Sequence, residues 1–149
     1  AIDARALRMT VLDREPLLLA LPAGHPLSGR SSLRLDEVAH EPFVAQPREV
    51  AMTLYDRLFR LAQKAGFQPQ IQRHVQQVNG MLAMVAAGLG LALVPATMRT
   101  VRLAGLAYVP VEDPDAYMLL AVASRANDTS PALAQFLTVV AETATTGSL

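Results

Sequence analysis

The 149-residue chain is long enough to bury the core of one ordinary domain, or of two small lobes that share strands. Its 13 basic and 13 acidic residues balance and are scattered, whereas a DNA-binding surface concentrates positive charge, so this segment alone is not expected to bind DNA. The lack of cysteine excludes disulfides and thiolate metal sites, and no apolar run reaches membrane-spanning length. Since no signal-peptide pattern is visible either, we expect a cytoplasmic protein with no membrane contact.

Short apolar runs and amphipathic stripes alternate along the first half of the chain. Residues 16–22 form a continuous apolar run between two prolines, which predicts a strand that is buried on both faces and central in a sheet. A turn-rich stretch follows, after which residues 33–40 predict a short helix and 43–45 a second strand. Apolar residues at helical spacing over 49–65 predict an amphipathic helix that ends at Gly66.

The second half of the chain continues this alternation. The predicted elements are a strand at 70–75, a helix from Val78 that stops at Gly88, a strand at 89–94, a weak helix at 96–103, strands at 106–111 and 117–123, and a last helix with Ser130 as its cap and Pro131 in its first position. Residues 143–149 are expected to be a frayed tail. Helices that alternate with buried strands predict an α/β architecture whose sheets are covered on both faces.

Two junctions between a strand and a helix are the candidate ligand sites, because α/β folds bind ligands beyond the carboxyl ends of their strands, where helix N-termini present unpaired N–H groups. The candidate ligand-binding residues are Gln46, Pro47, Arg48, Glu49 and Val50 at the first junction and Val78, Asn79 and Gly80 at the second. Arg48 could hold a ligand carboxylate, although Arg48 and Glu49 could equally be solvated residues of a first helical turn. Asn79 could cap the helix or donate to a ligand, and Gly80 would let a ligand approach the backbone.

No motif predicts catalysis, a metal or a cofactor. The three histidines, His25, His40 and His74, lack the spacing of metal ligands, and no Gly-x-Ser-x-Gly elbow is present. The two glycines of Gly88-Leu89-Gly90 lie after a helix and before a strand, the reverse of the order in a phosphate-binding loop, so we interpret them as helix termination. We therefore expect a binding module and not an enzyme.

Five segments, read in order, resemble the effector-binding domain of LysR-type bacterial transcriptional regulators. They are 17–27 (LLLALPAGHPL), 41–44 (EPFV), 65–69 (AGFQP), 85–96 (VAAGLGLALVPA) and 105–108 (GLAY) with Pro110. Each motif is weak by itself, but together they cover nearly the whole chain. The segment at 85–96 carries most of the resemblance.

The resemblance implies a type 2 periplasmic-binding-protein-like α/β fold, in which two Rossmann-like lobes are joined by two crossing strands and a small inducer binds between them. Residues 1–23 and 116–149 would then form an incomplete first lobe with the crossing strands, and residues 24–115 a second lobe. The start of the first lobe and the DNA-binding domain would be absent from this segment. Both candidate junctions match family positions that face the cleft.

The same resemblance implies a small organic-acid inducer, DNA binding only through the absent N-terminal domain, and a homodimer or homotetramer. The subgroup that senses acids of aromatic catabolism, such as benzoate or muconate, is the one that the chain most resembles in Pro47-Arg48-Glu49, in Tyr55-Asp56 and in the spacing from these to Gly66-Phe67. The alternative is a solute-binding or transport module of the same architecture, which the missing signal peptide and the resemblance disfavour.

Overall fold

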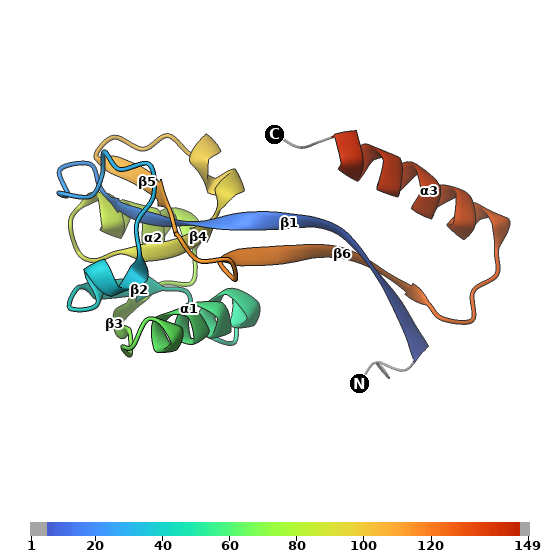
Figure 1. Ribbon diagram of the computed structural model, residues 1–149, viewed down its shortest axis with the longest axis horizontal. Coiled ribbons are helices and arrows are strands. Elements are labelled where there is room, and N and C mark those ends of the chain that lie inside the picture. The colour runs from blue at the N-terminus through green and yellow to red at the C-terminus, as the bar shows by residue number, and fades with distance from the viewer. Residues whose placement is uncertain (1–5, 147–149) are drawn as a thin grey trace. The chain divides into compact units, whose positions relative to one another are not determined.

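The computed structural model describes residues 6–146, with side chains described as far as residue 142 (Figure 1). In chain order its elements are β1 (Leu7–Pro22), the 3₁₀ helix η2 (Leu35–Val38), β2 (Pro42–Ala45), α1 (Met52–Lys64), β3 (Gln70–His74), α2 (Val78–Ala86), β4 (Ala92–Pro95), the 3₁₀ helix η3 (Ala96–Thr100), β5 (Leu106–Pro110), β6 (Tyr117–Arg125) and α3 (Pro131–Thr146). The chain divides into unit 1, Ala1–Glu15 with Leu119–Leu149, and unit 2, Pro16–Met118.

The sheet of unit 2 is centred on β1, which lies between β4 and β5 and pairs with both in the antiparallel sense (Figure 1). Leu19 is opposite Leu93 on one side and Val109 on the other. In a separate two-stranded sheet, β2 pairs in parallel with β3. A parallel bridge from Phe43 to Leu91 joins β2 to the chain that enters β4. The predictions of a central strand and of an α/β fold are therefore confirmed.

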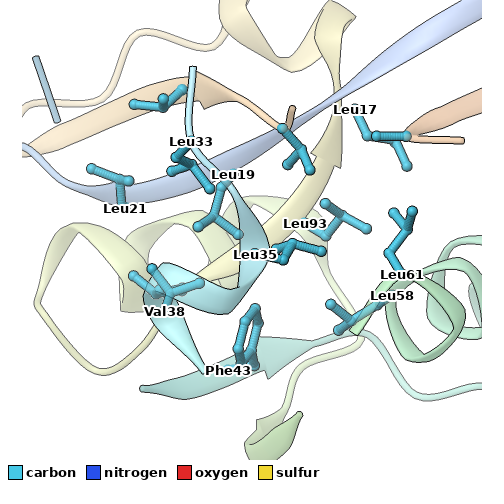
Figure 2. Close-up of a cluster of buried hydrophobic side chains, with 14 residues drawn as sticks. Leu17, Leu19, Leu21, Leu33, Leu35, Val38, Phe43, Leu58, Leu61 and Leu93 are labelled. Carbon is cyan, nitrogen blue, oxygen red and sulfur yellow. The ribbon is translucent and has the colours of Figure 1, made fainter. Parts of the chain in front are cut away.

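The core of unit 2 consists of two apolar clusters on opposite faces of this sheet. Residues 17–21 of β1 are at most 2% exposed, and because strand side chains alternate, the odd-numbered ones join one cluster and the even-numbered ones the other. Figure 2 shows Leu58 and Leu61 of α1 and Phe43 of β2 converging on the leucines of β1. On the other face, Met81 of α2 packs with the second cluster. Helices thus cover both faces of the sheet, as its apolar pattern predicts.

Glycines with positive φ end both helices of unit 2. Gly66 follows α1 with φ +88°, and its N–H donates to the carbonyl of Gln63 while the next N–H reaches Ala62, which is a Schellman motif. Gly88 follows α2 with φ +78°. Gly90 differs from both, because a Cβ built there would lie 2.8 Å from the carbonyl oxygen of Pro42. The prediction that Gly90 terminates a helix is therefore wrong. Gly90 instead lets the chain pass close to β2.

Several predicted boundaries are wrong by a few residues. The helix predicted over 33–40 is only the 3₁₀ helix η2, the one predicted from residue 49 begins at Met52 after a turn, and the strand predicted from residue 89 begins at Ala92. Leu89 is 47% exposed, since the chain has not yet entered the sheet there. Helical spacing in a sequence does not distinguish a first helical turn from a preceding turn of similar pitch.

Unit 1 contains the first residues of β1, most of β6, and α3. The hydroxyl oxygen of Ser130 accepts a hydrogen bond from the N–H of Leu133 at 3.2 Å, and Pro131 opens the helix, so the predicted cap is confirmed. Phe136 and Val139 of α3 are each 53% exposed. The helix continues to Thr146, so residues 143–146 of the predicted tail are helical, and residues 147–149 lie outside the described part.

Candidate ligand-binding site

The two predicted junctions meet at one edge of the parallel pair β2–β3. Ala45, the last residue of β2, is in register with His74, the last residue of β3. Beyond these ends the side-chain amide of Gln46 donates a hydrogen bond from Nε2 to the backbone carbonyl oxygen of Gln76 at 2.7 Å. The carboxyl ends of two parallel strands thus bring residues thirty positions apart into contact.

A narrow apolar recess of about 20 Å³, with room for about one water molecule, opens beside this edge. It is lined by Val44, Ala45, Gln46, Ala51, Leu54, Tyr55, Leu58, Met81 and Leu93. The lining thus comes from β2 and β4, from the start of α1, and from Met81 of α2. Gln46 adds a side-chain amide to this mostly apolar lining.

A more open and more polar recess of about 330 Å³ adjoins the first one, lined by Pro47, Arg48, Glu49, Tyr55 and His74. Tyr55 belongs to both linings and therefore separates the apolar recess from the polar one. Its ring stacks on Phe59 with centroids 4.8 Å apart and on His74 at 6.2 Å. These contacts hold the tyrosine ring in place at the boundary.

Arg48, the predicted anion anchor, is already paired with Asp56. Its Nε and Nη2 donate to the two carboxylate oxygens of Asp56 at 2.6 and 2.8 Å, which lowers the pKa of that carboxyl and raises the pKa of the guanidinium. The arginine side chain is 59% exposed, so solvent screens the pair. A guanidinium carries more N–H groups than one carboxylate can occupy, so the end of the fork that carries Nη1 can still donate to a second anion.

The structure gathers part of the predicted site and disperses the rest. Gln46 lines the apolar recess, and Pro47, Arg48 and Glu49 line the polar one. Val50 is 50% exposed and lines neither of these recesses.

At the second junction the predicted roles need correction. The N-cap of α2 is Gln77, without a side-chain cap hydrogen bond, so Asn79 is an exposed residue inside the helix and does not cap it. A Cβ on Gly80 would lie 3.1 Å from Cγ1 of Val75, so that backbone faces a neighbouring side chain and not an open approach. Val78 is partly buried against the second apolar cluster. The contribution of this junction is the carbonyl of Gln76 and the wall residue Met81.

Sequence reasoning missed the apolar walls of the recess. Leu54, Leu58 and Met81 fit the apolar stripes of their helices, and a stripe predicts burial without showing which of its residues border an unfilled space. Ala51 and His74 carry no pattern of their own. Tyr55 entered only through the resemblance to regulators of aromatic catabolism, although its place one turn into α1 puts it near the strand ends.

In the described part of the chain, no group of three or more histidine, cysteine, aspartate or glutamate side chains could hold a metal ion. Within residues 6–146, no helix has both the length and the apolar character needed to cross a membrane.

Comparison with known families decides the classification. The family model of the LysR substrate binding domain matches residues 2–145. The chain belongs to this family. This chain is 32% identical over 135 residues to the HTH-type transcriptional regulator BudR of Raoultella terrigena, and the match covers 91% of this chain and 47% of BudR. It is also 31% identical over 126 residues to the regulator BenM of Acinetobacter baylyi, and this match covers 83% of this chain and 41% of BenM.

Solved structures lead to the same fold. The BenM effector-binding domain with its effector benzoate matches with a TM-score of 0.83 and 27% identity over 96% of this chain and 65% of that one. Full-length BenM matches with a TM-score of 0.82 and 27% identity over 96% of this chain and 48% of BenM. The LysR domain therefore has the two-lobed, periplasmic-binding-protein-like α/β fold of these effector-binding domains, and it spans about half the length of the curated regulators that it matches.

Proposed function

We propose that the LysR domain binds a small carboxylate inducer at the carboxyl ends of β2 and β3 and thereby controls transcription. The observation that carries this proposal is the adjoining pair of recesses, one apolar and one containing Arg48, with Tyr55 between them. An aromatic or short aliphatic acid would widen the apolar recess, place its apolar body against Leu54, Leu58 and Met81, and direct its carboxylate toward Gln46 and Arg48. The benzoate that is the effector of BenM has this chemistry.

The binding residues that we propose are therefore Gln46, Pro47, Arg48 and Glu49 at the first junction, together with the recess residues Leu54, Tyr55 and Met81. Val50, Val78, Asn79 and Gly80 stay predicted ligand-binding residues, although none of them lines either recess. The carboxylate of Glu49 repels an anionic ligand, so it restricts the site to ligands whose own carboxylate lies nearer to Arg48.

The wider assignments follow from family membership and remain proposals for this chain. Residues 24–115 would be the second lobe, and residues 1–23 with 116–149 would be the crossing strands and part of the first. The domain would act in the cytoplasm as part of a homodimer or homotetramer, without catalysis, cofactor or metal, and would affect DNA through a separate DNA-binding domain. Inducer binding would shift the population between conformations of the regulator that differ in their effect on transcription.

The test is a thermal-shift comparison of matched acids and neutral analogues. Benzoate should raise the unfolding temperature of the chain in a saturable way, since a ligand that binds only the native state stabilises it. Benzamide, which has the same shape without the charge, should raise it much less, and cis,cis-muconate tests a longer acid. Equal stabilisation by benzoate and benzamide would contradict the anionic site, and conversion of any ligand to a product would contradict the absence of catalysis.

A further inference from the structure

Helix α1 runs from the candidate site to the loop that precedes β6. Its first turns supply Leu54 and Tyr55 to the recess, and its last residue, Lys64, lies at the opposite end. The ammonium Nζ of Lys64 is 2.9 Å from Oδ1 of Asp113 and 2.7 Å from Oδ2 of Asp115. Residues 112–116 form the segment that we call the 112–116 loop, and Lys64 bridges two of its three carboxylates, those of Asp113 and Asp115.

A second residue of α1 contacts the same loop and the strand that follows it. Nη1 of Arg57 donates to the backbone carbonyl oxygen of Asp115 at 3.4 Å, and its guanidinium lies 5.3 Å from the centre of the Tyr117 ring. Arg57 and Lys64 are two turns apart, so they attach one face of the helix to the loop at two points.

The 112–116 loop is also fixed to the central strand. The N–H of Leu17 donates to the carbonyl of Ala116 at 2.9 Å, and the N–H of Val111 donates to the carbonyl of Leu17 at 3.2 Å. The chain crosses between the two units at Glu15/Pro16 and at Met118/Leu119. In sequence, Leu17 and Ala116 each lie within three residues of one of these points. The loop thus contacts β1 and leads into β6 close to those points.

The body of α1 is suited to transmit a displacement from one end to the other. Leu58 and Leu61 are 2% and 1% exposed and pack into the first apolar cluster, and a helix anchored in a close-packed core shifts as a rigid element. A ligand that fills the recess must contact Leu54, Tyr55 or Leu58, all on this helix. Displacement of α1 by the ligand would reach Lys64 and Arg57 without any contact between the ligand and the loop.

We propose that α1 couples occupancy of the recess to the 112–116 loop, with Lys64 and Arg57 as positioning residues that carry the coupling. The identity of the ligand rests on the proposed function, but the coupling itself does not. An ordinary surface ion pair would stabilise the loop equally whether the recess is empty or filled. Coupling requires that the effect of filling the recess on the loop depends on Lys64.

This dependence can be measured without any ligand. Ala51→Leu places a larger side chain in the recess, and Ala45→Val does so from β2 in case the first substitution perturbs the start of α1. Amide hydrogen exchange at Asp113, Asp115 and Ala116 would be compared in the parent, in each recess variant and in Lys64→Met. It would also be measured in the double variants that combine Lys64→Met with a recess substitution. Arg102→Met is the control, because it removes an exposed cation of unit 2 outside α1 and leaves the Lys64 contacts in place.

The expected result is a change of at least about twofold in the amide exchange of the loop when the recess is filled. This change should disappear in Lys64→Met, persist in Arg102→Met and return in Lys64→Arg. The same change in the presence and absence of Lys64, or no change in either recess variant, would overturn the coupling.

A parallel titration with benzoate separates this inference from the proposed function. If benzoate does not bind but the recess variants change the loop through Lys64, the coupling holds and the proposed ligand class is wrong. If benzoate binds while neither it nor the recess variants alter exchange in the loop, the site holds and the coupling is overturned.

Discussion

Gln46 donates from its side-chain amide to the backbone carbonyl of Gln76 and thereby ties together the loops that follow β2 and β3. Gln46→Leu removes the donor at nearly constant size, and it should lower the free energy of unfolding by about 0.5–1.5 kcal/mol. Exchange of the amides at residues 76–79 should accelerate in the same variant. Gln63→Leu, at an exposed position of α1, is the control and should change neither quantity. Unchanged amide exchange in Gln46→Leu would show that other contacts, and not this hydrogen bond, hold the two loops together.

Gly90 should be less replaceable than Gly88, although both have positive φ. A side chain at Gly88 has open space, whereas a Cβ at Gly90 would lie 2.8 Å from the Pro42 carbonyl oxygen, which itself accepts the N–H of Leu91. Gly88→Ala should cost about 1–2 kcal/mol through backbone strain alone, and Gly90→Ala should cost more because β2 must also shift. Urea unfolding of the two variants gives this difference directly. Equal stabilities would contradict the close approach.

These glycines also show how far the sequence predicts the fold. Buried strands and helix stripes are visible because burial imposes periodicity, so β1, α1, α2 and the cap of α3 could be predicted. The role of Gly90 could not, because a clash with Pro42 arises only after two strands that are distant in sequence have been placed side by side. The boundaries of α1 and β4 were misjudged for a related reason, since turns next to regular elements share their composition.

The candidate site was predictable in position but not in composition. The rule that ligands bind beyond strand ends selects the loop after β2, and the structure places Gln46 and Arg48 at recesses there. It does not reveal that Arg48 is paired with Asp56 eight residues later, because an i, i+8 pair that starts outside a helix has no sequence signature. Nor does it show that Gly80 packs on Val75.

Ser130 should stabilise the start of α3 through its hydroxyl group. Ser130→Ala removes the acceptor for the N–H of Leu133 and should lower stability by about 1 kcal/mol, with faster exchange of the amides at residues 132–134. Ser130→Asp should restore the protection, since aspartate is an equally good cap and also complements the helix dipole. Exchange that is as fast in Ser130→Asp as in Ser130→Ala would argue against capping.

The Lys64 bridge should make stability depend on pH at both extremes. The hydrogen bond from Lys64 lowers the pKa of Asp115, so this contribution is present above the ordinary carboxyl pKa of about 4 and is lost as the pH falls through the lowered value. The same carboxylates raise the pKa of Lys64, so its contribution is lost only as the pH rises through that raised value, above about 10. Urea unfolding should therefore separate the parent from Lys64→Met at pH 7, and the two should converge at pH 2. A difference that persists unchanged at pH 2 would show that packing of the lysine stem, and not its charge, is responsible.

The most direct test of the proposed site is calorimetric titration of benzoate into the parent chain, Arg48→Gln, Asp56→Asn and the control Arg60→Gln. Because Asp56 competes for the Arg48 guanidinium, Asp56→Asn should bind more tightly than the parent, and Arg48→Gln about tenfold more weakly. Arg60→Gln should match the parent. Saturable binding with one affinity in all four proteins would contradict the assignment of Arg48 as the carboxylate anchor.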